Sequence, residues 1–492
     1  MRYIKSSRAV KPQRKQIFIP SFEGVSLEVS EHLLPYKYSP MSYNYRFSDG
    51  ALSGCEGIDN AKFPLFSDSS VIHECPVAPN SIVGLWLYRR YDNQSEMRDD
   101  RIIIRCADNK FYETKFFFSD SFHELAGIET AGRVNTASYR LNGNDVLLIS
   151  SEYGKLWVYD GENPPYSVDN SPEISSMCIH YERLFATTGG EKNQVWFSDD
   201  FDPTNWNISM KEGGFIEFSD DAGRANKVIS FLDHIYIFRD YGINRLTAYG
   251  SQNEFTMSRL FISSGRIYPD TVAAGGDRVF FLADDGVYAF DGVSARKILA
   301  NIQPMLKSKD YATGCIHDGK YYLALRLKFD DEKVLSEKEP FNRNNALVEY
   351  DFVTGSVNII RGVDINCMLP INLINTSMLT MAFRSLKRKE IGMTVDSGAF
   401  FNTPMPKFWR TPMITFNRKD GKFIREIAVD TEEDIIVGVW HNRYSEFKIN
   451  GSDKISVIKP AILADKFYVY LKSPGNRARI KSLAVIADLI SR

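Results

Sequence analysis

Cysteine is scarce in this sequence, and the few copies are not arranged as metal ligands or cross-links. The 492 residues include six cysteines, widely spaced, with no CxxC pair and no histidine cluster beside them. This spacing predicts neither a disulfide framework nor a zinc site. We expect buried free thiols at Cys55, Cys75, Cys106, Cys178, Cys315 and Cys367.

Long apolar runs are missing as well. No stretch approaches the roughly 18 continuous apolar residues of a membrane-spanning helix. The opening MRYIKSSRAVKPQRKQ lacks the apolar core of a signal peptide. We therefore expect a protein made and kept in a reducing cytoplasm, although a particle released by lysis fits equally.

Neither sign of charge dominates. Lysine and arginine number 60 and aspartate and glutamate 62, for a net charge of −2. A protein that grips nucleic acid through its phosphates usually carries a basic excess, so no such grip is expected. The one basic run, which we interpret as a solvated terminus, contains Arg2, Lys5, Arg8, Lys11, Arg14 and Lys15.

Motifs of common enzyme chemistry are also absent. The sequence contains no GxxxxGKS/T, GxGxxG, HExxH or GxSxG pattern. We interpret His180, His234 and His317, each at the start of a repeat strand, as hairpin residues. We predict that the protein is not an enzyme and has no catalytic, cofactor-binding or metal-binding residues.

Aromatic residues are abundant instead, at 13% of the chain, which favours a β-rich fold. The clearest signal is Gly275–Gly292, GGDRVFFLADDGVYAFDG. In it the apolar runs Val279–Ala283 and Val287–Phe290 flank the turn Asp284-Asp285-Gly286, which is a strong hairpin pattern. Because similar turns recur, we interpret this acidic turn as a connection between strands of a repeated unit rather than as a metal or catalytic site.

The hairpin is one of several similar units. The runs that we take as first strands fall near Val146, Leu184, Ile235, Val279 and Tyr321, at intervals of 38, 51, 44 and 42 residues. A period of about 40–50 residues with about four strands is typical of a β-propeller. We predict about six blades over 81–395, with five or seven as alternatives and the weakest pattern at 363–395. The charged insertion Asp330–Asn344 is interpreted as a solvated loop, with a gating or inter-subunit element as the alternative.

Two further regions flank the propeller. Residues 1–80 read as an extended arm, because Pro20, Pro35 and Pro40 forbid a long helix. We expect this arm to contribute to a platform or to contacts between subunits. Residues 396–492 alternate apolar and polar positions, which predicts a C-terminal β-sandwich or platform region. For the last run, ARIKSLAVIADLI (478–490), a strand is favoured over an amphipathic helix.

One acidic segment, SDDFDPTNW (198–206), has two interpretations. Alternate oxygens from Asp199, Asp200 and Asp202 could ligate calcium. We favour turn chemistry, in which the aspartates bond nearby backbone amides and a tryptophan packs beneath them. The segment resembles a structural turn of sialidase propellers, with Asp202 in place of its glycine, at Ser198, Asp200, Thr204 and Trp206.

A wider resemblance rests on strand and turn patterns. YERLFATTG (181–189), NQVWFSDDFDPTNW (193–206), FLDHIYIFRDYGINRLTAYGSQNEF (231–255) and the Gly275–Gly292 hairpin follow one another in this order. Together they resemble the propeller of tail nozzle or tail-hub proteins of short-tailed bacteriophages. IPSFEGV (19–25) and YNYRFSDGALSGCEGI (43–58) resemble the opening of related phage virion proteins.

This resemblance implies a structural virion protein without a membrane anchor, assembled in the host cytoplasm into the phage tail. It implies a homo-oligomeric ring, typically a hexamer, below the portal and its adaptor. The ring would extend the channel through which genomic DNA leaves the capsid, without sequence-specific binding, and could carry tail fibres. A near-neutral chain fits such a conduit, because a strongly basic lumen would hold phosphates.

Two other functions remain open. One is a baseplate or host-binding propeller of a longer-tailed phage. The other is a carbohydrate-binding or hydrolysing propeller, which carboxylates converging at the central channel would favour.

Overall fold

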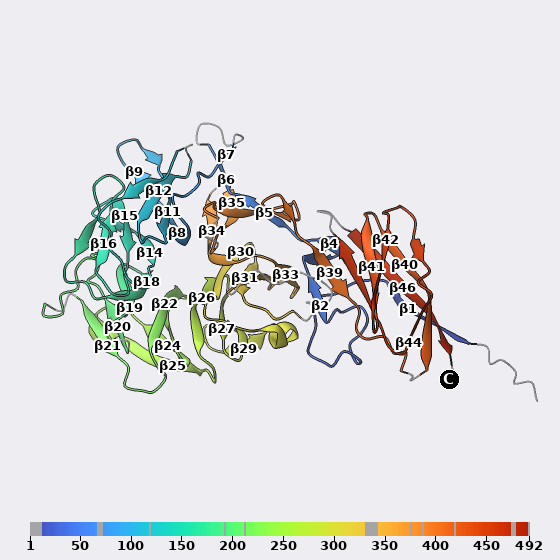
Figure 1. Cartoon of the computed structure of the whole chain (residues 1–492). Helices are drawn as coiled ribbons and strands as arrows, with labels where there is room; N and C mark the ends of the chain where they lie inside the picture. Colours follow the sequence, from blue (N-terminus) through green and yellow to red (C-terminus); the bar gives the residue numbers. More distant parts are fainter. Residues whose placement is uncertain are drawn as a thin grey trace, which may run out of the picture.

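The computed structural model describes residues 12–65, 72–117, 120–190, 193–210, 213–329, 343–373, 376–384, 388–417, 420–473 and 479–490. Within these ranges the chain forms 46 strands and two short 3-10 helices, η1 (Gln252–Glu254) and η2 (Ala300–Met305). No helix in the described ranges is long and apolar enough to cross a membrane. The strands form two bodies, a ring of small sheets and a two-sheet sandwich on its flank (Figure 1).

The ring consists of seven blades among the described residues, and six of them are four-stranded antiparallel sheets. Blades 1 to 3 contain β8 (Ile82–Tyr88), β11 (Arg101–Cys106), β12 (Phe111–Lys115) and β13 (His123–Leu125); β14 (Thr136–Leu141), β15 (Asn144–Ile149), β16 (Leu156–Tyr159) and β17 (Tyr166–Val168); and β18 (Ile174–His180), β19 (Arg183–Thr188), β20 (Gln194–Phe197) and β21 (Gly214–Glu217).

Blades 4 to 6 repeat this meander. They contain β22 (Ala225–Phe231), β23 (His234–Arg239), β24 (Gly242–Thr247) and β25 (Thr256–Ile262); β26 (Ile267–Gly275), β27 (Arg278–Ala283), β28 (Gly286–Phe290) and β29 (Ala295–Ile298); and β30 (Thr313–His317), β31 (Lys320–Leu325), β32 (Ala346–Asp351) and β33 (Val357–Arg361). Two ribbons, β6 (Lys62–Pro64) with β7 (Ile72–Glu74) and β9 (Tyr91–Asp92) with β10 (Met97–Arg98), lie outside the blades.

The seventh blade is built from two distant parts of the chain. Its strands β34 (Ile365–Leu373), β35 (Thr376–Phe383) and β36 (Gly392–Val395) come from the end of the repeat region, whereas β5 (Gly57–Asn60) comes from the N-terminal region. The short strands β37 (Ala399–Phe400) and β38 (Thr403–Pro404) extend this sheet.

The ring is closed. Each first strand contacts the first strand of the next blade, and β34 contacts β8. The β-propeller prediction is therefore confirmed, and its blade count of about six is corrected to seven. The repeat pattern is weakest at 363–395, which forms the seventh blade. The pattern is weak there because one strand of this blade comes from residues 57–60.

The structure also corrects the position of the recurring apolar runs within each blade. They are the second strands of the blades (β15, β19, β23, β27 and β31), not the first strands as predicted. A second strand has a neighbour on each side and a packed blade on each face, so it reads as a continuous apolar run. In β27, for example, all residues after Arg278 are buried.

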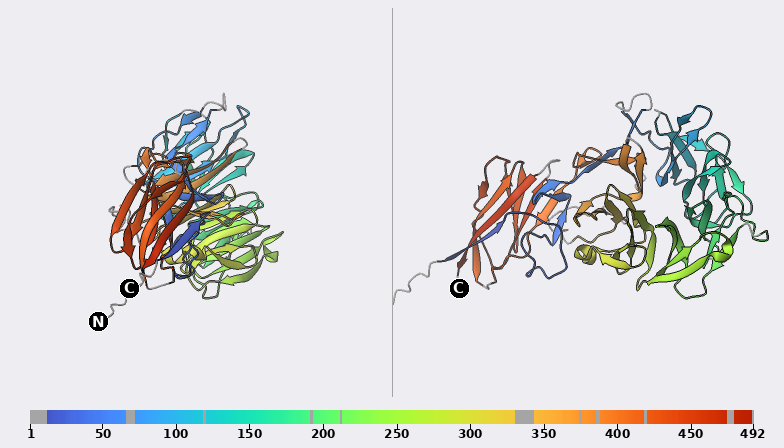
Figure 2. Two further views of the ribbon diagram at one scale, coloured as in Figure 1. Left: turned by 90° about the vertical axis from the view of Figure 1, so that its right-hand side faces the viewer. Right: turned by 180° about the vertical axis from the view of Figure 1, so that it is seen from behind.

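The second body is a β-sandwich to which both ends of the chain contribute (Figures 1 and 2). Its first sheet contains β1 (Gln13–Ile19), β3 (Tyr45–Ser48), β4 (Ala51–Gly54), β40 (Gly421–Thr431), β43 (Ser456–Ile458), β44 (Ile462–Ala464) and β46 (Arg479–Ile490). Its second sheet contains β2 (Met41–Tyr43), β39 (Lys407–Arg410), β41 (Ile435–Trp440), β42 (Tyr444–Ile449) and β45 (Tyr468–Ser473).

The N-terminal segment is thus divided between the two bodies. Strand β1 pairs with β46 along its whole length, and Ile17 and Ile19 enter the sandwich core. Strand β46 also confirms the strand interpretation of the last apolar run.

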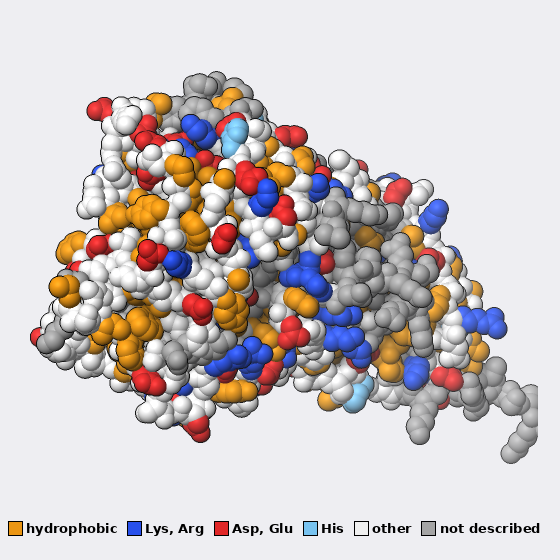
Figure 3. Space-filling model, turned by 60° about the vertical axis from the view of Figure 1, so that its left-hand side comes forward, with side chains coloured by type: hydrophobic (Ala, Val, Ile, Leu, Met, Phe, Trp, Pro, Cys, Tyr) orange, Lys and Arg blue, Asp and Glu red, His pale blue; other side chains and the backbone are white. Residues whose placement is uncertain are grey.

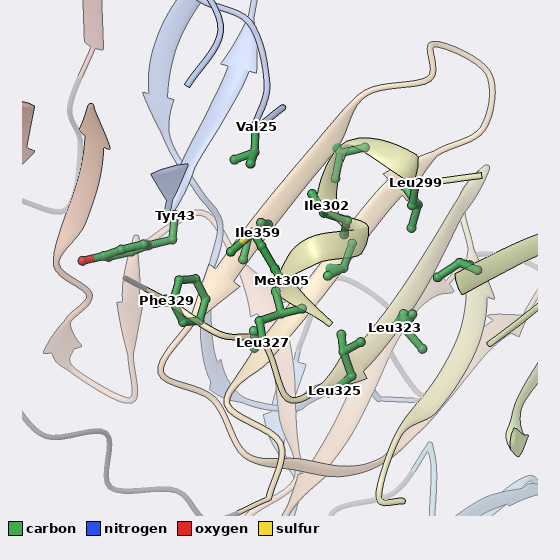
Figure 4. Close-up of a cluster of buried hydrophobic side chains, with 14 of the residues drawn as sticks. Val25, Tyr43, Leu299, Ile302, Met305, Leu323, Leu325, Leu327, Phe329 and Ile359 are labelled. Carbon is green, nitrogen blue, oxygen red and sulfur yellow. The ribbon is translucent and has the colours of Figure 1, made fainter. Parts of the chain in front are cut away.

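A shared core joins the propeller to the sandwich. Tyr43 of β2 stacks on Phe408 of β39 at a centroid distance of 5.4 Å and meets Phe329 edge-on at 5.5 Å. The Arg361 guanidinium lies over Tyr43 and Phe329, at 4.8 and 4.3 Å from their centroids. The same buried cluster continues through Leu323, Leu325, Leu327 and the residues of η2 (Figure 4). Apolar burial therefore fixes the two bodies against each other.

Candidate functional site

The histidines singled out from the sequence contact hydroxyl or carboxylate oxygens in blades 3, 4 and 6. His180 and His234 lie in adjacent blades and bond hydroxyls, with Nδ1 2.8 Å from Ser230 Oγ and 3.3 Å from Thr247 Oγ1. Burial lowers the pKa of both rings. His317, in another blade, has Nε2 3.4 Å from a carboxylate oxygen of Asp318.

The acidic segment at 198–206 has the contacts of a turn. Asp202 Oδ1 accepts hydrogen bonds from the Thr204 amide (2.9 Å) and hydroxyl (2.6 Å), and Asp199 Oδ1 accepts one from the Asp200 amide (2.8 Å). Trp206 is buried in the core beneath. No group of three or more histidine, cysteine, aspartate or glutamate side chains in the described ranges could hold a metal ion.

Two other segments from the sequence analysis cannot be placed. Residues 330–342 of the charged insertion and residues 1–11 of the basic run lie outside the described residues.

The acidic turns of the blades have a recurring structural partner. In blade 5 the Arg266 amide donates to Asp284 Oδ2 at 2.9 Å, and the Asp284 amide donates to the Arg266 carbonyl at 3.0 Å. These two bonds close the open end of the hairpin β26–β27. We call this pair of bonds the clasp.

The clasp occurs in three blades. In blade 2 the Arg133 amide donates to Glu152 at 3.0 Å, and in blade 4 the Arg224 amide donates to Asp240 at 2.9 Å. The return bond from the acid's own amide to the arginine carbonyl measures 3.0 Å in both blades. The acidic turn is thus a hydrogen-bonding element of the blade.

A glycine precedes each clasp arginine for a steric reason. A Cβ on Gly132, Gly223 or Gly265 would lie 2.8, 2.6 or 2.7 Å from the Cβ of the clasp acid. Real side chains essentially never approach so closely, so any larger residue would push the two halves of the clasp apart.

The three clasp arginines line one pocket. It has a volume of about 260 Å³ and lies where five consecutive blades, 2 to 6, enter or leave their inner strands around the axis of the ring. Its wall includes the three arginines and Glu152, together with Asp270 from β26 and Asp310 before β30. The rest of the wall is largely polar and includes Tyr153, Thr188 and Asn226.

Asp240 organises the arginine side chains. Its carboxylate accepts hydrogen bonds from the Arg224 Nε at 3.1 Å and the Asn226 Nδ2 at 2.9 Å, and the Arg266 Nε lies 3.6 Å away. Burial works to raise the Asp240 pKa, but these bonds and the Arg224 charge outweigh it and lower the pKa. Asp240 therefore stays ionised between two arginines.

Asp285, the second acid of the opening hairpin, is held separately. Its carboxylate accepts from Tyr288 Oη and Lys297 Nζ, both at 2.7 Å, and from Ser264 Oγ at 3.0 Å. Burial opposes ionisation here, yet the donors lower the pKa of Asp285. This network lies within one blade and serves its packing.

The sequence analysis missed the pocket residues. A signal was present, because Gly132-Arg133, Gly223-Arg224 and Gly265-Arg266 each open a blade, and an acid follows the second strand, 19, 16 or 18 residues after the arginine. The acidic turn by itself does not reveal this partner, because the glycine-arginine pair lies 16 to 19 residues earlier in the chain.

Comparisons with known proteins bear on the fold and not on this site. No protein-family model matches the sequence, and no curated protein matches it. A crystal structure of BBS1N in complex with ARL6DN, soaked with lead, matches 65% of this chain and 93% of its own at 12% identity, with a TM-score of 0.41. A structure of Chaetomium thermophilum Raptor matches 72% of this chain and 29% of its own at 9% identity, with a TM-score of 0.44.

Proposed function

We propose that this chain is a structural subunit of a bacteriophage tail that forms a ring below the portal and adaptor and extends the DNA channel. The phage assignment is supported by the strand and turn resemblance described above. The assembly role is supported by two bodies joined through one core and, above all, by an apolar sheet face that the described residues leave uncovered.

This face is the outward side of the seven-stranded sheet of the sandwich. Phe18 of β1 lies opposite Ala484 of β46, Ala484 opposite Ala428 of β40, and Ala428 opposite Val457 of β43. Phe18 and Val457 are 60% and 52% exposed, and Leu463 of β44, on the same face, is 58% exposed. We call this surface the outer sheet face.

Alternation explains why these side chains point outward. The neighbours of Phe18, Ile17 and Ile19, are buried in the sandwich core, so Phe18 must lie on the opposite face. An apolar patch that spans four adjacent strands is larger than the scattered apolar residues of an ordinary surface, and such patches mark sites of association.

The occupant that suits this face best is a second copy of the chain. The charged residues on and around it carry both signs, for example Arg14 and Arg425 paired with Asp488, and Lys481 paired with Glu432. A surface of mixed sign suits a near-neutral partner better than a strongly charged one. If the patch meets a different surface of the next copy, the contact is heterologous, and it forms a ring when the rotation between successive copies closes.

The surface charge is compatible with a DNA conduit. Acidic and basic side chains both occur among apolar ones on the face seen in Figure 3, with a small group of Lys and Arg side chains near its centre. A channel without a large basic field would bind phosphates weakly and let DNA pass.

The experiment is to measure the mass of the purified full-length chain in solution by light scattering and to image it by negative staining. We expect rings, and we expect Val457→Asp or Leu463→Asp to dissociate them, because an uncompensated charge would be buried at the contact. Val353→Asp is the matched control, because Val353 is 81% exposed in a propeller turn away from this face.

Two results would contradict the proposal. A wild-type chain that stays monomeric up to its solubility limit would count against ring formation. Rings that survive both sandwich substitutions would exclude the outer sheet face as the contact. For the phage assignment, antibodies against the chain should label the tail end of virions from the same source, and labelling elsewhere would refute it.

A further inference from the structure

The pocket at the propeller axis carries two arginine side chains whose ends are unused. Arg224 and Arg266 are both held at Nε by the carboxylate of Asp240. Their terminal nitrogens make no hydrogen bond to the residues that the structure describes. The arginines come from neighbouring blades, so the two forks are positioned by the clasp and not by a flexible loop.

Two of the cations around the pocket have carboxylate partners other than Asp240. Arg133 lies 3.5 Å from Glu152, and Lys227 of β22 interacts with Asp270. Among the described residues Arg224 and Arg266 share the single buried carboxylate of Asp240, so each guanidinium keeps N–H donors that this carboxylate does not occupy. The oxygen pairs of a carboxylate or a phosphate match the geometry of guanidinium forks.

The same charges limit how negative the ligand can be. Glu152, Asp270 and Asp310 line the rest of the wall, so a dianion or a polyanion would meet repulsion there. Carboxylates accept hydrogen bonds well, and an uncharged hydroxyl is a donor that suits them. The volume of about 260 Å³ corresponds to roughly eight or nine water molecules, which is the space of one small polar molecule.

We infer that the axial pocket binds a hydroxylated monocarboxylate of the size of a single sugar acid, with its carboxylate between Arg224 and Arg266 and its hydroxyls toward the acidic wall. This inference does not rest on ring formation, since all the residues belong to one propeller. It agrees with the carbohydrate-binding alternative considered from the sequence.

The test is isothermal titration of the full-length chain with glucuronate, and with glucose and glucose 6-phosphate as matched neutral and dianionic probes. We expect glucuronate to bind more tightly than both. Arg266→Gln and Arg224→Gln should each weaken glucuronate binding at least tenfold, because each removes a charge-assisted contact worth about 1.5–3 kcal/mol. The clasp uses backbone atoms of the arginine, so these variants should keep the hairpin bonds and fold, and their unfolding temperatures are measured beside the wild type because each variant also loses a side-chain contact with Asp240.

The control variant is Arg296→Gln. Arg296 is an exposed arginine in the outer strand β29 of blade 5, the blade that Arg266 opens. It should bind glucuronate like the wild type. Equal binding of glucuronate and glucose would overturn the inference, and so would tighter binding of glucose 6-phosphate. Undiminished binding by an Arg224→Gln, Arg266→Gln double variant would also overturn it. Ring formation in any of these variants bears only on the proposed function.

Discussion

The amide of Arg266 and the carboxylate of Asp284 are joined by a hydrogen bond of 2.9 Å across the open end of the hairpin β26–β27. The bond has two effects. It fixes the point at which the chain enters the inner strand of the blade, and it places the Arg266 side chain at the mouth of the axial pocket. Because blades 2 and 4 carry the same bond, one local device both closes hairpins and builds the pocket.

Removing the clasp acid should destabilise the propeller. In Asp284→Ala the Arg266 amide and the Tyr268 hydroxyl, which donates to Asp284 Oδ1 at 2.7 Å, both lose their acceptor. We expect the free energy of unfolding to fall by about 1–3 kcal/mol, measured by urea denaturation. Asp277→Ala is the control, because Asp277 is a well-exposed residue of the hairpin turn and should cost under about 0.5 kcal/mol. Equal losses for both variants would show that the clasp does not stabilise the blade.

The clasp glycine should be equally intolerant of a methyl group. In Gly265→Ala the new Cβ would lie 2.7 Å from the Asp284 Cβ and 3.1 Å from the Asp284 and Asp285 amide nitrogens. Overpacking of this kind costs about 1–3 kcal/mol, and we expect a corresponding drop in the unfolding temperature measured by calorimetry. A new Cβ on Gly24 meets only a carbonyl oxygen at 3.6 Å, so Gly24→Ala should be tolerated. A harmless Gly265→Ala would contradict the proposed close packing.

The sequence predicts those parts of the fold that depend on neighbours along the chain. The hairpin Val279–Phe290 was visible because alternating turns and buried strands lie within a few residues of one another. The seventh blade is not predictable in this way. Its strand β5 at 57–60 pairs with β36 at 392–395, and no periodicity in the sequence relates these two segments. The same holds for β1 and β46, which pair across almost the whole chain.

The site shows a similar division. The dipeptide Gly265-Arg266 and the acid at 284 are a local signal that repeats in three blades. That Arg224 and Arg266 would share the Asp240 carboxylate could not be read from spacing, because it depends on how blades 4 and 5 meet at the axis. The sequence therefore predicts the Gly-Arg and acid pattern within each blade, but it does not predict which side chains of different blades meet at the axis.

The cysteines should resist modification in the folded protein. All six are free, and burial raises the pKa of Cys106 to about 11 and of Cys55, Cys178 and Cys367 to about 12. Because the thiolate is the reactive form, almost none is present at pH 8. We expect no rapid reaction of the native chain with Ellman's reagent at pH 8, and six reactive thiols in guanidinium. A fast native reaction would show an exposed, activated cysteine, and fewer than six thiols after denaturation without reductant would show a disulfide.

A buried ion pair between the two bodies should make stability depend on acid. Glu349 of β32 is 2% exposed and lies 2.8 Å from Arg46 Nη2 of β3 and 2.7 Å from Lys320 Nζ of β31. Burial works to raise the Glu349 pKa, but Arg46 and Lys320 outweigh it, so the pKa is lowered in the folded state. The stabilisation is therefore complete above the unfolded pKa of about 4.3 and is lost as pH falls through the folded value.

Glu349→Gln should expose this dependence. At pH 7 the substitution leaves two cations without their shared carboxylate, and we expect a loss of about 3 kcal/mol in the free energy of unfolding. As the pH falls through the lowered folded-state pKa of Glu349, the wild-type carboxyl also becomes neutral, so the difference between the two proteins should shrink. Urea denaturation at several pH values measures it, with Glu446→Gln at the half-exposed pair with Lys472 as a control expected to cost under about 1 kcal/mol. A difference that stays constant from pH 7 down to the lowest pH at which the protein folds would show that Glu349 does not contribute through its charge.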